Sequence, residues 1–295
     1  MDESFTERTE VPQPEPAYAL ADLLGVPVPD LDAGLPLLWH WAYLLDRPAL
    51  ADLGPDGHPV RGTLPAPPGH GRRRMWAGGR VAALGALRCG EPATKRTRVL
   101  KVTEKHGRSG HLTFVTVGVQ VRQGGAVVVD EEQDIVYRDA AGPPAAAQPG
   151  AAAQPAAGRP ATAESPEVPA PAVPAGQGER EIAVSPVLLF RFSALTYNAH
   201  RIHYDRDYCR DVEGYPGLVT HGPLQALAMA EAARAGGDAG GSGDVSFEYR
   251  LVSPLFDDQG LIVGAVPGPD GTTATAARDR HGRVTATGTL RGPGR

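Results

Sequence analysis

A proline- and alanine-rich segment interrupts the chain near its middle. From Ala141 to Gly178 the sequence reads AGPPAAAQPGAAAQPAAGRPATAESPEVPAPAVPAGQG. It contains no aromatic residue, and Val168 and Val173 are its only aliphatic side chains larger than alanine. Such a segment cannot bury enough apolar surface to offset the entropy lost on ordering, and its recurring prolines favour an extended spacer. We therefore expect a linker over residues 141–180 that separates two folded units.

The length of the chain fits this division. A chain of 295 residues is long enough for two domains of roughly 100–200 residues each. We expect a disordered tail over residues 1–16, an N-terminal domain over 17–140 and a C-terminal domain over 181–293. The tail reads MDESFTERTEVPQPEP, an acidic stretch without the apolar run of a secretory signal.

Charge, cysteine content and hydropathy narrow the class of protein. The net charge of −5 does not indicate nucleic-acid binding, which usually shows a basic domain. The two cysteines, Cys89 and Cys209, lie in different halves, which predicts a reduced compartment without disulfides. No stretch approaches the roughly 18 consecutive apolar residues of a membrane helix. We expect a cytoplasmic protein that binds neither nucleic acid nor a membrane.

The N-terminal domain shows one helical pattern followed by strands. The helical pattern covers Ala17–Leu24, and the aromatic run LPLLWHWAYLL follows at Leu35–Leu45. Between residues 113 and 122 valine recurs at every second position, which is the period of a half-buried strand. Strands are predicted over residues 81–87, 95–102, 113–122 and 126–137.

The C-terminal domain begins with an apolar stretch at Val187–Phe192, which predicts a strand. A helix is predicted over Pro223–Ala235, because Leu224, Leu227 and Ala228 share one face and two glycines follow. Further strands are predicted over residues 245–251, 260–266 and 272–289.

The two domains are weak repeats of each other. WAGGRVAALGALRCGEP in the first and GDVSFEYRLVSPLFDDQ in the second share a glycine, a strand with an early valine, a leucine and an acidic turn. A helix packed on an antiparallel sheet, duplicated in tandem, belongs to the α+β class. This is the fold class that the pattern predicts.

The most polar, ring-rich stretch of the chain is TYNAHRIHYD, Thr196–Asp205. Its histidines, His200 and His203, allow three interpretations. A metal site is disfavoured, because structural zinc sites bring further closely spaced ligands that are missing here. A solvated loop and an acid/base site both remain open, since a histidine with an ordinary pKa near 6.5 can take and return a proton near neutral pH.

A candidate oxyanion site follows in VTHGP, Val219–Pro223. Proline is favoured at the first helical position, so Gly222 is expected at the N-cap of the next helix. A backbone N–H at that end can point at a developing negative charge. The same glycine is equally consistent with a tight turn that serves only the fold.

The two segments just described, read with their flanking residues, resemble a known family. LFRFSALTYNAHRIHYD followed by EGYPGLVTHGPL closely resembles the MaoC-like, double-hotdog acyl-thioester hydratases and dehydratases. Within them it is most similar to the branch that includes mesaconyl-C4-CoA hydratase, itaconyl-CoA hydratase and the mitochondrial 3-hydroxyacyl-thioester dehydratase. PLLWHWAYLL, RRMWAGGRV, VTEKHGRSGHLTFVTV and EEQDIVYR extend the resemblance through the first half. It implies a tandem hotdog fold, each unit a long helix wrapped by a curved antiparallel sheet.

The family motif, Gly-Asp-x-Asn-Pro-Ile-His, overlays the polar stretch with one important difference. Its histidine falls on His203 and its isoleucine on Ile202, but Asn198 holds the position of the catalytic aspartate. His200 and Arg201 take the asparagine and proline positions. An amide cannot accept a proton, so Asn198 is expected only to orient water or substrate.

The resemblance implies reversible hydration of an enoyl thioester or dehydration of a 3-hydroxyacyl thioester, which needs no metal and no redox cofactor. His203 is then the proton-transfer residue, assisted by His200 or Asp205, and the Gly222 N–H stabilises the thioester oxyanion. The C-terminal domain carries catalysis, while the N-terminal domain completes the acyl tunnel. A short branched dicarboxylic substrate, such as mesaconyl-C4-CoA or itaconyl-CoA, fits the branch.

Several other side chains are candidates for substrate binding. Arg72, Arg73 and Arg74 suit the phosphates of coenzyme A or an acidic carrier protein, although a solvated basic turn is as plausible. Arg201 suits a free substrate carboxylate or an ion pair that bridges the domains. We also expect Tyr197 and His200 to contact substrate.

Two alternatives stay open at this point. Because Asn198 replaces the aspartate, the chain fits a non-catalytic acyl-thioester-binding hotdog protein, and less well a thioesterase. The expected partner is an acyl group carried on coenzyme A, with acyl carrier protein as the alternative carrier. A monomer or a homodimer satisfies the tandem architecture.

Overall fold

The computed structural model describes residues 5–61, 72–107, 110–139, 171–236 and 245–292. Most of the predicted linker, residues 141–170, therefore lies outside the described residues. Residues 171–178 have no regular secondary structure, but the last two residues of the predicted linker, 179 and 180, begin a strand. None of the helices within these ranges is long and apolar enough to cross a lipid bilayer.

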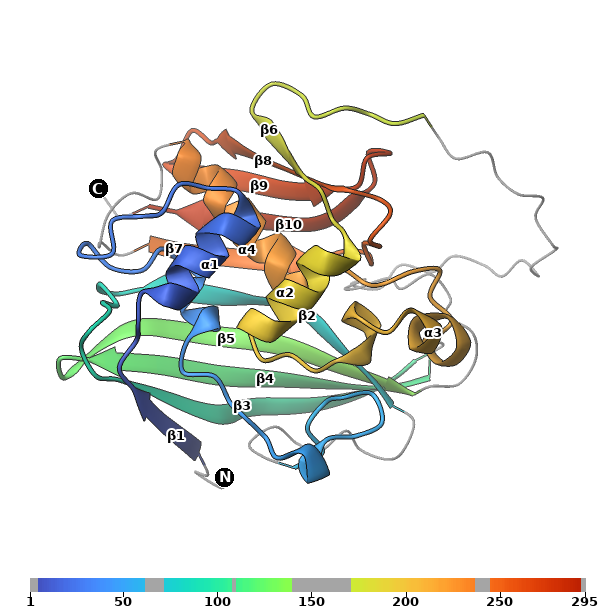
Figure 1. Cartoon of the computed structure of the whole chain (residues 1–295), viewed down its shortest axis with the longest axis horizontal. Helices are drawn as coiled ribbons and strands as arrows, with labels where there is room; N and C mark the ends of the chain where they lie inside the picture. The colour runs from blue at the N-terminus through green and yellow to red at the C-terminus, as the bar shows by residue number, and fades with distance from the viewer. Residues whose placement is uncertain (1–4, 62–71, 108–109, 140–170, 237–244, 293–295) are drawn as a thin grey trace.

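Ten strands form a single sheet in the order β1-β3-β4-β5-β2-β7-β10-β9-β8-β6 (Figure 1). Every pairing within it is antiparallel. The strands are β1 (Phe5–Glu10), β2 (Arg72–Ala83), β3 (Ala93–Gly107), β4 (Gly110–Gln123), β5 (Ala126–Asp139), β6 (Glu179–Ile182), β7 (Val245–Leu251), β8 (Leu261–Pro267), β9 (Thr272–Arg278) and β10 (Val284–Arg291).

The strand order is symmetric about its centre. Each half of the chain contributes five neighbouring strands, and the halves meet where β2 pairs with β7 from Gly78↔Arg250 to Ala83↔Val245. The two sequence segments that read as weak repeats contain β7 and most of β2, including the paired residues. The repeat pattern therefore marks the seam at which the halves join.

Helices cover one face of this sheet (Figure 1). They are α1 (Glu15–Leu24), α2 (Pro186–Leu195), α3 (Arg206–Tyr208) and α4 (Gly222–Ala235), with short turns of other helix types at η1 (Trp39–Ala42), η2 (Leu50–Asp52), η3 (Arg201–His203) and η4 (Cys209–Glu213). α4 packs on β8, β9 and β10, and α1 packs against α2. The predicted helices at 17–24 and 223–235 are confirmed, as is the α+β class.

Both halves share one hydrophobic core. Leu20 and Leu24 of α1 belong to the same buried cluster as Leu224 and Leu227 of α4. The aromatic run of the first half adds a polar link, because the buried indole of Trp39 donates its Nε1–H to Glu231 of α4 at 2.8 Å. In the same run, His40 and Trp41 bond to buried Glu131 on β5.

The predicted strand at Val187–Phe192 is wrong, because these residues lie in α2. The Ser185 side chain accepts the N–H of Leu188 at 3.2 Å and caps the helix, and Pro186 follows at its start. A serine cap and a first-turn proline favour a helix, and they outweigh the apolar run.

Two other expectations need correction. Residues 5–10 fall in the predicted disordered tail, but they form β1, which pairs with β3 and places Phe5 under the guanidinium of Arg96 at 4.1 Å. The predicted strand over 272–289 is divided into β9 and β10 by a turn. Asp279 organises that turn by accepting the backbone N–H groups of His281 and Arg283, each at 2.9 Å.

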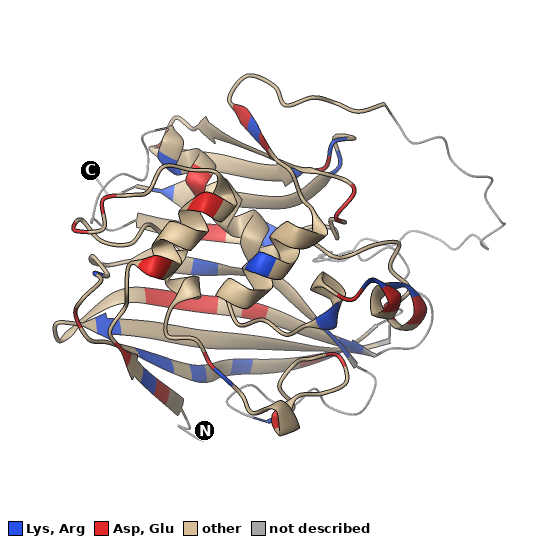
Figure 2. Cartoon of the chain, viewed as in Figure 1, with Lys and Arg blue, Asp and Glu red and all other residues tan. Residues whose placement is uncertain are grey.

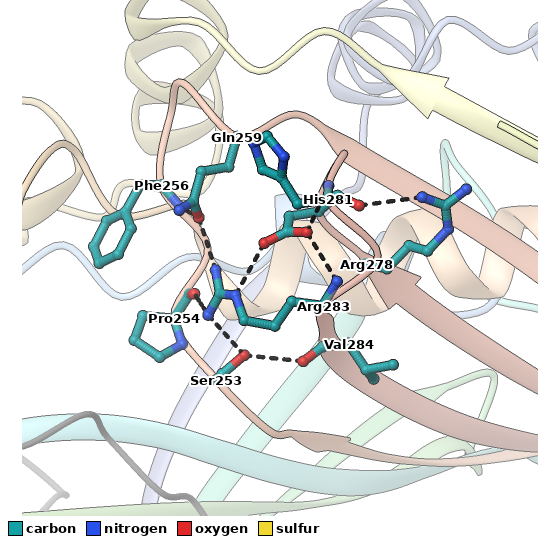
Figure 3. Close-up of polar contacts among 9 residues, drawn as sticks. Ser253, Pro254, Phe256, Gln259, Arg278, His281, Arg283 and Val284 are labelled. Carbon is teal, nitrogen blue, oxygen red and sulfur yellow. Dashed lines mark hydrogen bonds and ion pairs between the residues drawn. The ribbon is translucent and has the colours of Figure 1, made fainter. Parts of the chain in front are cut away.

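Figure 3 shows how Arg283 fixes this turn to the rest of the half. Its guanidinium donates to Ser253 Oγ, to the Pro254 carbonyl and to Gln259 Oε1 at 2.8–3.1 Å. Ser253 in turn donates to the carbonyl of Val284 at 2.9 Å. The loop between β7 and β8 is therefore held against the start of β10.

The seam yields a first prediction, at Gly78 of β2. A Cβ atom added there would lie 2.4 Å from the backbone oxygen of Tyr249 on β7. Because backbone cannot move aside cheaply, we expect Gly78→Ala to lower the free energy of unfolding by about 1–3 kcal/mol. Urea denaturation monitored by circular dichroism would measure it. Gly118→Ala is the matched control, since its Cβ would meet only the movable side chain of Leu100; equal losses in both variants would contradict the seam interpretation.

Candidate active site

The polar stretch Thr196–Asp205 begins where α2 ends. Tyr197 adopts a left-handed conformation with φ of 51°, which turns the chain out of the helix. Asn198 then accepts the backbone N–H of His200 on its Oδ1 at 3.0 Å. Its own N–H donates to the carbonyl of Ser193 at 2.8 Å. Asn198 thus shapes the turn that delivers His200, as asparagine commonly does in loops.

His203 is buried, with 7% of its surface exposed. Its Nδ1–H donates to the carbonyl of Val219 at 2.7 Å. A neutral imidazole that donates from Nδ1 keeps its lone pair on Nε2, so this hydrogen bond fixes the tautomer. The ring stacks on that of His221, with centroids 3.6 Å apart. The imidazole therefore lies beside the start of α4 and away from bulk solvent.

α4 begins at Gly222, and its N-cap is His221, one residue earlier than the sequence predicts. No side chain among the described residues caps this helix, so the amides of its first turn are available to a ligand. A Cβ at Gly222 would lie 2.2 Å from Leu251 Cδ1. Gly222 therefore lets β7 approach the helix terminus closely.

One large cavity of about 2310 Å³ brings these groups together. It is lined from both halves of the chain, and its lining includes His58, Arg74, Tyr197, Asn198, His200, His203 and Gly222. Its volume exceeds the roughly 300–1,000 Å³ of ordinary small-molecule sites. His203 and the start of α4 therefore line the same cavity.

Sequence reasoning missed two residues of the N-terminal half. The ring of His58 lies against that of His200, with centroids 3.9 Å apart. His58 donates its Nδ1–H to Asp56 at 3.2 Å, and its backbone N–H to the other oxygen at 3.0 Å. The signal available in the sequence was GPDGHP, in which an acid and a histidine flank a glycine. Only the fold shows that this loop reaches the other half.

Two predicted binding residues, Arg201 and Arg73, lie outside the described cavity lining. Arg201 is not part of the described cavity lining; it pairs with Asp205 at 2.8 Å, covers the ring of Tyr208 at 4.1 Å and donates to the carbonyl of Pro55 at 3.0 Å. Arg201 thus links the two halves, which is one of the two predicted roles. The link is a hydrogen bond to the carbonyl of Pro55 and not an ion pair.

Of the arginine triplet, only Arg74 lines the described cavity. Arg73 is ion-paired with Glu213 at 2.7 Å. Arg72 begins β2, but its side chain lies outside the described residues. Tyr197 lines the rim, with 52% of its surface exposed and Arg47 6.0 Å from its ring.

Among the described residues, two groups of side chains have the spacing of metal ligands, with ligand atoms within 4.8 Å of one another. They are Asp56, His58 and His200, and Glu104, His106 and His111. In the first group, Nδ1 of His58 already donates to Asp56, and Arg74 is close enough to lower the pKa of both histidines. These observations favour an acid/base group there. The absence of a metal stays a prediction.

Burial controls the protonation of the site. It lowers the pKa of His203 to about 3. Burial also holds the pKa of His200 and His221 well below the ordinary value, with further lowering from neighbouring histidines. Burial and the charge of Arg74 lower the pKa of His58, which Asp56 partly offsets. All four imidazoles are therefore neutral at neutral pH.

This gives a prediction for stability against pH. A histidine whose pKa is lowered by folding binds its proton only in the unfolded chain, so stability is complete above pH 6.5 and is lost as the pH falls toward the folded pKa. Each such histidine contributes up to about 1.4 kcal/mol per pH unit. Urea denaturation between pH 7 and 4.5 should show this slope. His203→Gln should reduce it, whereas an unchanged slope would contradict the burial argument; His281→Gln, at the β9–β10 turn, is the control.

Comparisons with known proteins identify the family. The model of the hydroxyacyl-thioester dehydratase type 2 family matches residues 38–257. Mesaconyl-C(4)-CoA hydratase from Chloroflexus aurantiacus is 42% identical over 273 residues, which cover 88% of this chain and 89% of that protein.

Two solved structures share the fold. A MaoC-like dehydratase from Phytophthora capsici has a TM-score of 0.63 at 17% identity, covering 98% of this chain and 95% of its own. A Mycobacterium tuberculosis protein with a double hotdog fold has a TM-score of 0.52 at 15% identity, covering 97% and 94%. The chain therefore belongs to the hydroxyacyl-thioester dehydratase type 2 family and is an acyl-thioester hydratase or dehydratase with a tandem hotdog fold.

Proposed function

We propose that this enzyme adds water reversibly to an enoyl-CoA in the cavity between His203 and Gly222. The observation that carries the proposal is the fixed tautomer of His203. Its Nδ1–H is bound to Val219, so the Nε2 lone pair is left to accept a hydrogen bond from water. The start of α4 lies next to it through the stacked ring of His221.

The chemistry divides between the two ends of the reacting unit. The water oxygen bonds to the β-carbon, its proton passes to an imidazole, and the π electrons move onto the thioester oxygen. The Gly222 N–H, aided by the helix dipole, stabilises that oxyanion. The enolate then takes a proton at the α-carbon, and dehydration follows the same path in reverse. His203 orients the water, and its Nε2 is one atom that can accept the proton.

The substrate that we favour is a short dicarboxylic enoyl-CoA of the mesaconyl-C4 type. The identity of 42% to a mesaconyl-C(4)-CoA hydratase over most of both chains supports this choice. The free carboxylate of such a substrate needs a cation inside the cavity. Arg74 lines the cavity, close to His58 and His200. An arginine guanidinium can bind a carboxylate through two parallel hydrogen bonds.

The coenzyme A moiety needs basic side chains farther from the histidines. Lys95, Lys101 and Lys105 of β3 line the same cavity. Figure 2 shows Lys and Arg recurring along that strand. We propose that they bind the phosphates of coenzyme A or an acidic carrier protein, in a cytoplasmic enzyme that needs no further cofactor.

The central test is substitution of His203. His203→Ala should lower the turnover of an enoyl-CoA by about 100-fold or more, because it removes the group that orients the water. Asn198→Ala should lower it by about 10-fold, since one hydrogen bond that positions His200 is lost. Loss of enoyl absorbance measures turnover, and thermal unfolding checks the fold. Near-native turnover in His203→Ala would require another mechanism. If the unsubstituted protein binds enoyl-CoA but does not hydrate it, the chain is a binding protein.

Substrate choice tests Arg74. Arg74→Ala should lower kcat/KM for mesaconyl-C4-CoA by about 10–100-fold, the value of a charge-assisted hydrogen bond, while crotonyl-CoA is affected little. Arg201→Ala is the control, because Asp205 and Pro55 already engage that guanidinium. If Arg201→Ala shifts the preference and Arg74→Ala does not, Arg201 binds the carboxylate.

A further inference from the structure

If His203 took the proton from water, the described residues of the C-terminal half would offer no neighbouring carboxylate to balance its positive charge. The group bound to His203 is the neutral carbonyl of Val219. Asn198 holds the position of the family's aspartate, and its amide cannot accept a proton. Asp205 is engaged by Arg201 and is not part of the described cavity lining. An imidazolium formed on buried His203 would therefore lack a neighbouring carboxylate from the described residues of its own half.

A loop of the N-terminal half is built against this site. Residues 53–59 form a closed turn, in which Leu53 bridges to Pro59 and the Gly54 N–H donates to the carbonyl of His58 at 2.7 Å. The backbone N–H of Arg201 donates to the carbonyl of Asp56 at 2.9 Å.

The contact between this loop and the polar stretch is too close for any residue but glycine. Gly57 has a φ of +85°, and a Cβ there would lie 1.9 Å from the carbonyl oxygen of Ala199. The Arg201 guanidinium adds a bond to the carbonyl of Pro55 at 3.0 Å. The loop is therefore docked at a defined position.

This docking brings the imidazole of His58, hydrogen-bonded to the Asp56 carboxylate, into the cavity. Asp56 accepts both the ring and the backbone N–H of His58, so the His58 ring is fixed and its Nε2 carries the lone pair. The ring packs on His200, which lies 5.4 Å from His203 between ring centroids. His58 and His203 line the same cavity.

We propose that His58 is the catalytic base of this site and that Asp56 is its positioning residue, both supplied by the N-terminal half to a site otherwise formed by the C-terminal half. The inference rests on the proposed hydration reaction and assigns its proton acceptor. Asp56 then stands in for the aspartate that Asn198 replaces, acting through an imidazole.

The step balances without a further reactant. Water held by His203 loses a proton to Nε2 of His58 as its oxygen bonds to the β-carbon, and the π electrons move onto the thioester oxygen. The His58 imidazolium, paired with the Asp56 carboxylate, returns that proton to the α-carbon as the enolate collapses. Both histidines are neutral again at the end of the cycle.

The resting charges suit this role. Burial opposes ionisation of Asp56, but hydrogen bonds from His58 outweigh it and keep the pKa of Asp56 below its ordinary value. Burial and Arg74 keep the pKa of His58 low. Among the described residues, the titratable groups near the Asp56–His58 pair are Arg74 on β2, Tyr137 on β5, and Tyr208, His200 and His203 of the other half.

Substitution with pH profiles tests the assignment. His58→Gln should lower kcat by about 100-fold or more with KM changed little, as for loss of a general base. Asp56→Asn should lower kcat less, and should move the acid limb of the profile to lower pH, because the carboxylate raises the pKa of His58. The controls are His281→Gln and Asp22→Asn, which lie outside the described cavity lining. Native kcat in His58→Gln, or an acid limb unmoved in Asp56→Asn, would overturn the proposal.

A second measurement separates this inference from the proposed function. Histidine ring ¹⁵N resonances, assigned by substitution, would be recorded with and without butyryl-CoA, a saturated thioester that cannot react. Shifts at both His58 and His203 support the proposal. A shift at His203 alone leaves hydration standing and removes His58 from the site. No shift at either ring shows that the cavity does not bind acyl thioesters, so both proposals fail.

Discussion

The pairing of β2 with β7 is the contact on which the rest of the structure depends. It joins two five-stranded halves into one sheet, and both halves contribute to the larger hydrophobic core. Gly78 allows β2 to approach β7, because a Cβ at that position would lie 2.4 Å from the backbone oxygen of Tyr249. With the seam closed, loops from one half reach the polar stretch of the other.

Burial of the histidine rings is the second feature that determines the chemistry of the site. Four imidazoles lie in or beside one cavity, and burial is the largest cause of the lowered pKa of each. Neutral rings are acceptors of hydrogen bonds from water, whereas charged rings are only donors. The fold thus keeps the site ready to bind a water molecule, and a carboxylate is needed only while a proton is in transit.

Features set by local pattern could be predicted from the sequence. The period of Leu224, Leu227 and Ala228 gave α4, and alternating valines gave β4. The short polar stretch, read with the family motif, pointed to His203 and Gly222, which line one cavity. The α2 helix was not predicted, because a short apolar run is common to buried strands and helices, and the Ser185 cap decides between them in the fold.

What the sequence could not reveal are contacts between distant segments. Nothing local to GPDGHP indicates that His58 packs on His200, since that contact exists only once the halves are joined. For the same reason, the sequence leaves open whether Arg201 binds a substrate carboxylate or bridges the domains, whereas in the fold Asp205 and Pro55 engage it.

The close approach of Gly57 to Ala199 has a consequence for how such a protein evolves. Duplicated units usually drift apart, each free to accumulate changes on its own. Here a side chain gained at residue 57 would collide with the main chain of the other half, so a change at this contact in one copy requires a matching shift in the other.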